Sequence, residues 1–353
     1  MRIAVFNAGS SSLKCKLFDF PSKHLLYEKT IEHIGEEGYG IASHLEALEL
    51  LEIDFDSLDA VGHRVVHGGE RLQQSVFVDA HVKASIKELS VLAPLHNPAN
   101  LLGIEVAMQK APNIPHVAVF DTAFHATMPK EAYLYALPFA LYEKEGIRRY
   151  GFHGTSHAYL AKEAAKILKK ELRETNIITL HLGNGASACA IKDGKSIDTS
   201  MGFTPLEGLV MGTRCGDIDA EIVLYLEREL QMNPKEIEKL LNKESGLKGI
   251  CGENDMREIL LREDEQAKLA VAIMVRRIQK YIGAYMVMLE DIDAIVFSGG
   301  IGENSKEIRD AVMSNRVLKG MKSLVIQTDE ELEIANECYR LVISSFEPHY
   351  RLS

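Results

Sequence analysis

Residues 3–17, IAVFNAGSSSLKCKL, decide the fold, because they predict a strand, a turn of small residues and a second strand. Residues 177–191, IITLHLGNGASACAI, repeat this pattern, and the following KDGK at 192–195 predicts a further hairpin turn. Two halves that each open on such a hairpin indicate an internal duplication. We therefore predict an α/β protein with two related lobes.

The rest of the chain alternates between strand and helix patterns. Strands are predicted at 2–6, 13–18, 59–66, 116–120, 177–182, 187–191, 293–298 and 323–327. Helices are predicted at 43–51, 80–93, 98–110, 156–172, 218–230, 234–242, 264–290 and 329–342. The segment that follows 293–298 predicts a glycine-rich turn, and the best lobe boundary lies near 148–153.

Composition excludes several functional classes. The 353 residues carry 40 Lys and Arg against 51 Asp and Glu, a net charge of −11, so a basic nucleic-acid footprint is missing. No apolar run approaches the ~20 residues that span a bilayer. Five cysteines form no CxxC pair, which suits a reducing compartment. Because the chain opens on a strand and shows no signal peptide, we expect a cytoplasmic protein with no membrane partner.

Residues 204–219, TPLEGLVMGTRCGDID, are the most informative for function. Arg214 stands among glycines, which let a backbone turn tightly and approach a ligand. A guanidinium held in such a loop matches carboxylate or phosphate oxygens two at a time. The loop is equally explained as a surface turn in which Arg214 pairs with Asp217.

Nine motifs together resemble the acetokinase (acetate kinase) family, within the superfamily of actin, the Hsp70 ATPase domain and the sugar kinases. They occur in the family's order and span nearly the whole chain, which makes the set specific. The chain is shorter than family members usually are, and Cys215 stands where a serine is common. The motifs are NAGSSSLK at 7–14, HRVVHGG at 63–69, PLHNP at 94–98, FDTAFH at 120–125, YGFHGTSH at 150–157, HLGNG at 181–185, GTR at 212–214, GGIGEN at 299–304 and TDEEL at 328–332.

The resemblance implies two duplicated actin-like (ribonuclease H-like) lobes with a cleft between them. It implies an N-terminal lobe of residues 1–149, on which a C-terminal helix at about 335–353 packs back, and a nucleotide-binding and dimerisation lobe of residues 150–334. The implied reaction is reversible, Mg²⁺-dependent (or Mn²⁺-dependent) transfer of the ATP γ-phosphate to acetate, giving acetyl phosphate and ADP, in a homodimer. Alternatives are a propionate or butyrate kinase, a non-catalytic nucleotide-binding sensor and an actin-like polymer.

The resemblance also assigns the catalytic residues Arg64, Asp121, His153 and Arg214. The two arginines are expected to clamp the carboxylate and the transferred phosphoryl group, although paired arginines are also explained as structural salt bridges. A carboxylate acceptor is already ionised near neutral pH, so Asp121 is expected to bind metal or orient an arginine instead of acting as a base. His153 is expected to donate a hydrogen bond to the phosphoryl oxygens.

The remaining site residues fall into three sets. The predicted metal-linked residues are Asn7 and Glu330, although Glu330 is alternatively only a helix cap. The predicted acyl pocket holds Arg64, Val66, Leu95, Phe152 and Pro205. The predicted nucleotide-binding residues are Asn7, Ser10, Ser12, Lys14, His181, Asn184, Gly185, Asp255, Met256, Arg257, Gly300, Ile301 and Asn304.

Overall fold

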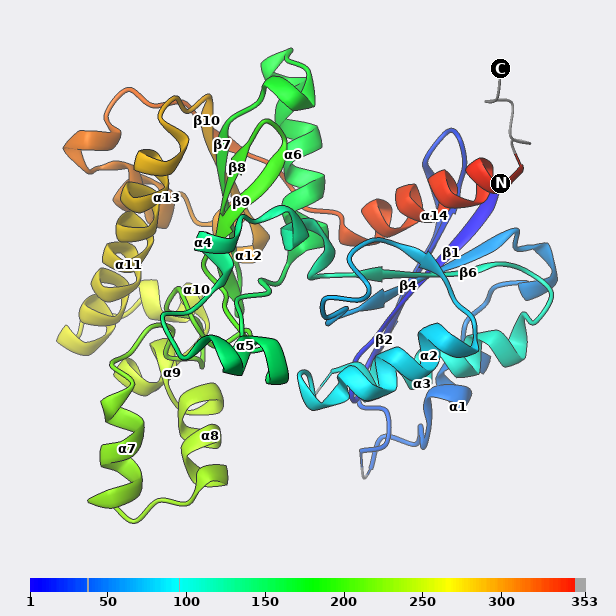
Figure 1. The fold of residues 1–353 in the computed structure, drawn as a ribbon, viewed down its shortest axis with the longest axis horizontal. Coiled ribbons are helices and arrows are strands. Elements are labelled where there is room, and N and C mark those ends of the chain that lie inside the picture. Colours follow the sequence, from blue (N-terminus) through cyan, green and yellow to red (C-terminus); the bar gives the residue numbers. More distant parts are fainter. Residues whose placement is uncertain (37, 95, 347–353) are drawn as a thin grey trace. The chain divides into compact units, whose positions relative to one another are not determined.

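The computed structural model describes residues 1–36, 38–94 and 96–346, which divide into two compact units (Figure 1). Unit 1 comprises residues 1–126, 154–156 and the described part of 329–353, and unit 2 comprises residues 127–153 and 157–328. The predicted lobes, 1–149 with about 335–353 and 150–334, remain a prediction, and the compact units differ from them in assigning 127–149 to unit 2 and 154–156 and 329–334 to unit 1. No helix among the described residues is both long and apolar enough to cross a membrane.

Unit 1 is built on a six-stranded mixed sheet in the order β3-β2-β1-β4-β6-β5. The strands β1, β4 and β6 are parallel, while β2, β3 and β5 run antiparallel to their neighbours. Their bounds are β1 Arg2–Ala8, β2 Leu13–Asp19, β3 His24–Ile31, β4 Ala60–Val65, β5 Val76–Phe77 and β6 His116–Phe120.

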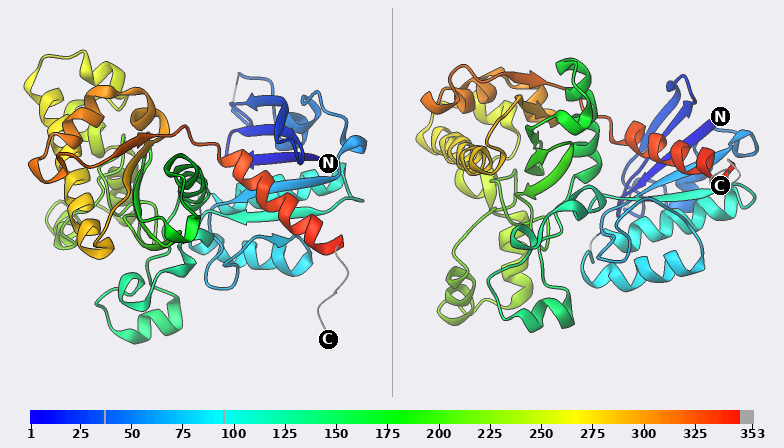
Figure 2. Two further views of the ribbon diagram at one scale, coloured as in Figure 1. Left: turned by 90° about the horizontal axis from the view of Figure 1, so that it is seen from above. Right: turned by 45° about the horizontal axis from the view of Figure 1, so that its top comes forward.

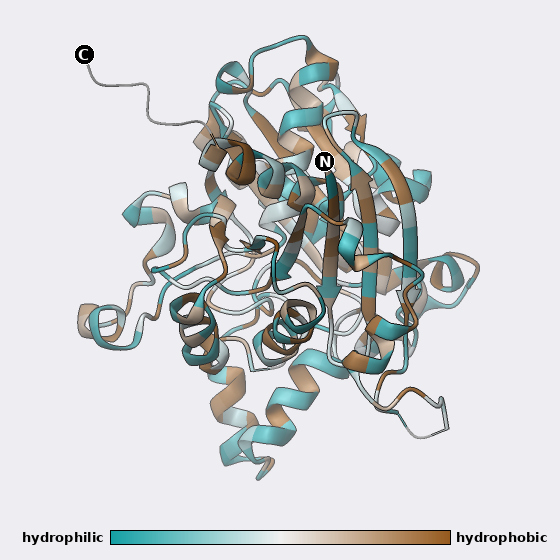
Figure 3. Cartoon of the chain, turned by 90° about the vertical axis from the view of Figure 1, so that its right-hand side faces the viewer, coloured by the Kyte–Doolittle hydropathy of each residue, from teal (hydrophilic) through white to brown (hydrophobic). Residues whose placement is uncertain are grey.

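Helices cover both faces of this sheet, so its central strand β1 is buried on each side. Ala4, Phe6 and Ala8 pack against α1 and α3, whereas Ile3 and Val5 pack against α14. Figure 2 shows α14 in red along the sheet, and Figure 3 shows brown bands along the strands. A strand buried on both faces reads as a continuous apolar run, as β1 does. The helices are α1 His44–Glu49, α2 Ala80–Glu88, α3 Asn97–Lys110 and α14 Glu330–Phe346.

Unit 2 is built on a five-stranded sheet in the order β11-β10-β7-β8-β9. β7, β10 and β11 are parallel, and β7, β8 and β9 form an antiparallel meander. The strands are β7 Ile177–Leu182, β8 Ala186–Lys192, β9 Lys195–Thr199, β10 Ala294–Ser298 and β11 Ser323–Val325.

The longest helix of unit 2, α11 (Glu265–Leu289), contacts β7 and β8 and carries α9, α10 and α13 on its other sides. The helix α6 (Gly154–Leu168) begins in unit 1 and continues into unit 2, where it lies beside β7 (Figure 1). The other helices are α4 Lys130–Tyr133, α5 Phe139–Glu145, α7 Glu221–Arg228, α8 Pro234–Lys243, α9 Gly246–Cys251, α10 Met256–Leu260, α12 Gly299–Asn304 and α13 Lys306–Met313.

Apart from the extra edge strand β5 in unit 1, the two sheets have the same strand order, which confirms the predicted duplication. An antiparallel meander of three strands is followed by two parallel strands in each unit: β1-β2-β3 with β4 and β6, and β7-β8-β9 with β10 and β11. The predicted α/β class with two related lobes is therefore correct.

Some local predictions were wrong. The glycine-rich segment after β10 is a helix, α12, because the Glu303 carboxylate accepts hydrogen bonds from the Gly299 N–H and the Ser298 hydroxyl and so fixes the first turn. The edge strand β3 was missed because most of its residues are exposed and give no apolar signal. The helix expected at 80–93 ends at Glu88 and continues as a 3₁₀ turn.

Two buried histidines link β4 to β6 in the core of unit 1. His116 Nε2 lies 2.9 Å from the Ala111 carbonyl oxygen, and His63 Nε2 lies 2.9 Å from His116 Nδ1. A carbonyl only accepts, so His116 carries its proton on Nε2 and accepts at Nδ1 from His63. Burial lowers the pKa of both rings, and that of His63 falls well below its usual value.

We predict that acid destabilises the protein through this pair. The folded state keeps both rings neutral while the unfolded chain protonates them, so the free energy of unfolding falls as the pH drops below about 6.5. Each ring contributes a slope of about 1.4 kcal/mol per pH unit. Denaturant unfolding between pH 5 and 8 measures this slope. His63→Gln should flatten it, and the exposed His24→Gln control should not. Equal slopes for His63→Gln and the wild type would contradict the prediction.

Candidate functional site

The candidate groups of unit 1 lie where three parallel strands end. Asn7 is near the end of β1, Arg64 is near the end of β4, and Asp121 follows β6, its N–H donating to the Val65 carbonyl. Arg64 is opposite Val119, and Asp121 lies two residues further along, hence on the same face of the sheet. Val5 and Val119 of that face pack against α14, whose first turn begins at Glu330.

Arg64 is the centre of this group. Its Nη2 lies 2.7 Å and its Nε 3.0 Å from Asp121 Oδ2, and its Nη1 reaches Asn7 Oδ1 at 3.5 Å. Glu330 Oε2 lies 3.8 Å from Nη2. The Asp121 carboxylate is 1% exposed and also accepts from the Thr155 hydroxyl. The structure thus brings together four predicted residues and orients Arg64 through Asp121.

The charges of the group shift its pKa values in opposite directions. Burial lowers the pKa of Arg64, but Asp121 and Glu330 outweigh it and the net pKa rises. Burial, reinforced by Asp121 and Glu331, raises the pKa of Glu330 to about 6 against the opposing effect of Arg64. Glu330 does not cap α14, because the Leu332 N–H is bound by the Asp329 carboxylate.

Lys14, predicted to face phosphate, pairs with a carboxylate in this structure. Its Nζ lies 3.0 Å from Glu331 Oε2, and Glu331 also contacts Lys16 at 3.5 Å. Ser10 and Ser12 occupy the β1–β2 turn, which is closed by a bond from the Gly9 N–H to the Ser12 carbonyl. Among the described residues, no three His, Cys, Asp or Glu side chains are arranged to enclose a metal ion.

In unit 2, predicted residues gather at the β7–β8 turn. His153 caps α6 in the left-handed conformation, with φ of 56°, which is uncommon for a residue with a side chain. Its Nδ1 lies 2.9 Å from the Ser187 hydroxyl, and its ring centroid lies 4.4 Å from that of His181. A Cβ placed on Gly185 would lie 3.6 Å from His153 Nε2 and 3.7 Å from Arg214 Nη1. His153, Arg214 and Gly185 therefore converge.

Arg214 differs from Arg64 because it has no carboxylate partner among the described residues. Its Nη1 donates to the Pro205 carbonyl at 3.1 Å and contacts the Met211 sulfur at 3.6 Å. Burial alone lowers its pKa. The alternative of an Arg214–Asp217 ion pair is wrong, because Asp217 instead binds Arg277 and Tyr281. A partly buried, uncompensated guanidinium favours an anionic ligand.

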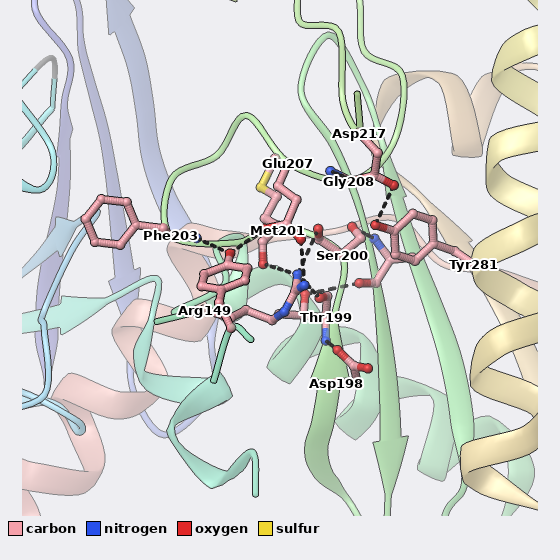
Figure 4. A network of polar contacts seen from close by, with 12 residues as sticks. Arg149, Asp198, Thr199, Ser200, Met201, Phe203, Glu207, Gly208, Asp217 and Tyr281 are labelled. Carbon is pink, nitrogen blue, oxygen red and sulfur yellow. Dashed lines mark hydrogen bonds and ion pairs between the residues drawn. The ribbon is translucent and has the colours of Figure 1, made fainter. Parts of the chain in front are cut away.

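A polar network holds the start of the loop that carries Arg214 (Figure 4). Arg149 Nη1 donates to the carbonyl oxygens of Thr199, Ser200 and Met201, where the chain leaves β9. Its Nη2 binds one oxygen of Glu207 at 2.6 Å, and the Tyr135 hydroxyl binds the other. The side chains of Tyr135 and Arg149, from two other segments, thus fix residues 199–207.

The predicted nucleotide residues of unit 2 fall in two places. Asn184 adjoins α10 through Asn254, whose Nδ2 lies 3.3 Å from Asn184 Oδ1. Asp255 caps the start of α10 and pairs with the exposed Arg257, while Met256 is buried. Gly300, Ile301 and Asn304 lie on α12, which contacts β7, and the Asn304 amide donates to the Gly300 carbonyl.

The structure describes all of the predicted acyl-pocket residues except Leu95. Val66, 7% exposed, follows β4, and its N–H donates to the Asn100 side chain. Phe152 is buried in unit 2, and Pro205 binds Arg214 through its carbonyl. Leu95 lies outside the described residues.

Sequence reasoning missed four residues that contact the predicted ones: Thr155, Ser187, Glu331 and Asn254. Thr155 lies in the motif at 150–157 and Glu331 in the motif at 328–332, so their position beside predicted site residues could have identified them. Ser187 bridges His153 and the buried His157, at 2.9 and 2.8 Å, and a serine in a strand gives no signal for that role.

Comparison with known proteins identifies the family. The family model described as the acetokinase family matches residues 40–352. The chain belongs to the acetokinase family. It is 49% identical to the acetate kinase of Sulfurimonas denitrificans over 387 residues, covering 97% of this chain and all of that protein. It is 50% identical to the acetate kinase of Helicobacter acinonychis, covering 97% of this chain and 99% of that one.

Solved structures agree. The acetate kinase of Porphyromonas gingivalis superposes with a TM-score of 0.90 at 39% identity, covering 97% and 99% of the two chains. A propionate kinase from Francisella tularensis gives 0.91 at 42% identity, covering 96% and 99%. As an acetokinase family member, the chain is a phosphotransferase whose acceptor is a carboxyl group.

The alignment with the Sulfurimonas protein also shows that this chain is shorter than that relative, as the sequence analysis predicted. Because 97% of the 353 residues is about 342, about 45 of the 387 positions aligned with the Sulfurimonas protein have no counterpart here.

We predict that Arg214→Ala lowers kcat by roughly 10³-fold or more, the scale of an arginine clamp on a phosphoryl group. Arg214→Lys should restore little, because a point charge cannot replace the planar fork. Acetyl phosphate formation at saturating substrates measures the effect. The exposed Arg71→Ala, which breaks a surface pair with Glu88, is the control and should keep full turnover.

Arg64→Ala is expected to lower kcat on the same scale, but it also leaves Asp121 buried and unpaired, which is strongly destabilising. Arg64→Ala with Asp121→Asn removes that charge and separates folding from catalysis. A folded Arg214→Ala or double variant with near-normal turnover would contradict the assignment.

Proposed function

We propose that this chain is an ATP:acetate phosphotransferase that forms acetyl phosphate and ADP reversibly by direct in-line transfer. The observation that supports this most directly is Arg214, an arginine without a carboxylate partner among the described residues, converging with His153 on the Gly185 turn. A guanidinium and an imidazole at a glycine turn suit phosphoryl oxygens, because both donate hydrogen bonds and glycine allows close approach.

The proposed roles follow from the chemistry of the transfer. A carboxylate acceptor needs no base, so the protein supplies orientation and positive charge. We assign Arg64 in unit 1 and Arg214 in unit 2 to binding carboxylate or phosphoryl oxygens, and His153 to donating a hydrogen bond to phosphoryl oxygens. Asp121 holds the Arg64 fork in a fixed direction. Asp121 is thus a positioning residue in this scheme.

Mg²⁺ is the proposed metal, held through Asn7 and Glu330. Their oxygens are the ligand type that Mg²⁺ prefers, and both lie against Arg64. Mg²⁺ is usually bound by one or two carboxylates, with substrate phosphates and water as the other ligands. Asn7 and Glu330 would therefore supply only part of the coordination. When bound, the ion would neutralise phosphate charge. Mn²⁺ has the same ligand preference.

For the nucleotide we propose the β7–β8 turn, α10 and α12. Asn184 and Gly185 lie in the turn, His181 lies near the end of β7 opposite Ser298, and Gly300 and Ile301 lie in the first turn of α12. These elements are neighbours in unit 2. Ser10, Ser12 and Lys14 are proposed to contact phosphate from the β1–β2 turn, which requires Lys14 to exchange its Glu331 partner for phosphate.

We further infer a homodimer and a cytoplasmic location. All five cysteines lie in the described part of the chain, none of them is in a disulfide, and four are buried, which suits a reducing compartment. Sedimentation of the purified chain tests the dimer.

The direct experiment on function is hydroxamate trapping of acyl phosphate, with acetate, propionate and butyrate compared at matched concentrations. Acetate should give the highest kcat/KM. A preference for propionate would favour the second candidate, which the likeness to the Francisella propionate kinase keeps open. No acyl phosphate with any of the three would overturn the proposal.

We predict that Val66→Ala raises kcat/KM for propionate relative to acetate by about tenfold. The β-branched Val66 is proposed to occupy the space of the extra methylene, which is worth ~1–3 kcal/mol. Leu72→Ala, a buried apolar truncation in the same unit, is the control for general loosening and should leave the ratio unchanged. If the ratio stays constant in Val66→Ala, Val66 does not line the acyl pocket.

A further inference from the structure

The loop that carries Arg214 has a narrow base, formed by Gly208 and Asp217. The Gly208 N–H donates to Asp217 Oδ1 at 2.8 Å, and the Asp217 N–H donates to the Gly208 carbonyl at 3.0 Å. These two bonds close residues 209–216 into a loop. Gly208 has φ of 109°, and a Cβ there would lie 2.5 Å from the Ser200 carbonyl oxygen, so only glycine fits.

The base is held by one face of α11. Arg277 donates from Nη1 to the Gly208 carbonyl at 2.8 Å and from Nη2 to the Asp217 carbonyl at 3.0 Å. The Tyr281 hydroxyl donates to Asp217 Oδ2 at 2.9 Å. Arg277 and Tyr281 are four residues apart and therefore lie on the same side of the helix. Figure 4 shows Tyr281 pointing at Asp217, with Gly208 beside it.

We propose that Asp217, Arg277 and Tyr281 are positioning residues, which set the direction of the Arg214 guanidinium by holding the base of its loop to α11. The proposal rests on the proposed catalytic role of Arg214. None of the three forms a hydrogen bond or ion pair with the Arg214 side chain among the described residues; their bonds close the loop or join it to α11. Each carbonyl and carboxylate oxygen at the base has a donor, so the base has one well-defined arrangement.

A catalytic arginine needs this support because no described residue gives Arg214 an equivalent of the carboxylate that orients Arg64. The Asp121 carboxylate fixes the Arg64 guanidinium by accepting hydrogen bonds from two of its nitrogens, Nε and Nη2. Arg214 has only a carbonyl and a thioether among the described residues, so its direction depends on the backbone beneath it. Since a shift of about 1 Å in a reacting group costs up to about 100-fold, loosening the base should lower turnover.

The test uses Tyr281→Phe and Asp217→Asn in the full-length enzyme, each with and without Arg214→Ala. In the wild-type background both should lower kcat by roughly 10- to 100-fold with KM for ATP and acetate little changed, because the lost interaction acts in the transition state. In the Arg214→Ala background neither should lower kcat further.

Tyr285→Phe is the matched control. Tyr285 lies one turn beyond Tyr281 on α11, is 2% exposed, and its hydroxyl has no hydrogen-bond partner among the described residues. Removing that oxygen leaves the loop base intact, so kcat should not change. Thermal unfolding of all variants accounts for any loss of folded protein, and Tyr281→Phe, the conservative change, remains informative if Asp217→Asn does not fold.

Unchanged kcat in Tyr281→Phe would overturn the proposal. So would an equal loss of kcat in the two backgrounds, because that pattern indicates a general structural defect. If Arg214→Ala itself keeps normal turnover, the catalytic role of Arg214 fails first, and the positioning role fails with it. Failure of the catalytic role of Arg214 is distinguishable from failure of the positioning role, because it appears in the single Arg214→Ala variant.

Discussion

The burial of the central strands on both faces is the constraint on which the candidate sites depend. β1 and β7 are hydrogen-bonded on both edges, and helices cover both faces of β1, so a polar side chain can reach a ligand only where a strand ends. Ligand sites in sheets with parallel strands occur at their carboxyl ends for this reason. Asn7, Arg64 and Asp121 occupy three such ends in unit 1, and His181 and Ser298 occupy two in unit 2.

The same constraint explains how much of the fold the sequence predicts. β1, β6, β7 and β10 were located closely, because strands buried on both faces are continuous apolar runs. The duplication was visible because both meanders open on turns of small residues. β3 was missed because its exposed side chains leave no pattern, and α12 was missed because glycines suggest a turn unless a carboxylate such as Glu303 fixes the helix start.

For the site, motif order predicted which residues matter but not which residues they contact. The resemblance placed Arg64 and Asp121 in one site, and the structure joins them directly. It could not give the partner of Asp217, since Tyr281 lies 64 residues further along the chain and belongs to a helix predicted only from apolar spacing. Contacts of this kind arise when α11 packs on the sheet, and a local pattern does not encode them. The pairing of Asp217 with Arg214, which adjacency suggested, was wrong for that reason.

The two arginines show two ways of placing a positive charge, with different consequences. Arg64 is surrounded by Asp121, Glu330 and Asn7, so its charge is largely compensated and its side chain is fixed by side chains. That group cannot draw in an anion strongly by itself, and a divalent cation at Glu330 would restore the positive balance that phosphate requires. Arg214 has no carboxylate partner within the described ranges, so it keeps its charge at the cost of partial burial and relies on the backbone for direction. An anion that binds Arg214 would remove that cost, so binding energy is available at an arginine whose position is set by the backbone and not by a neighbouring carboxylate.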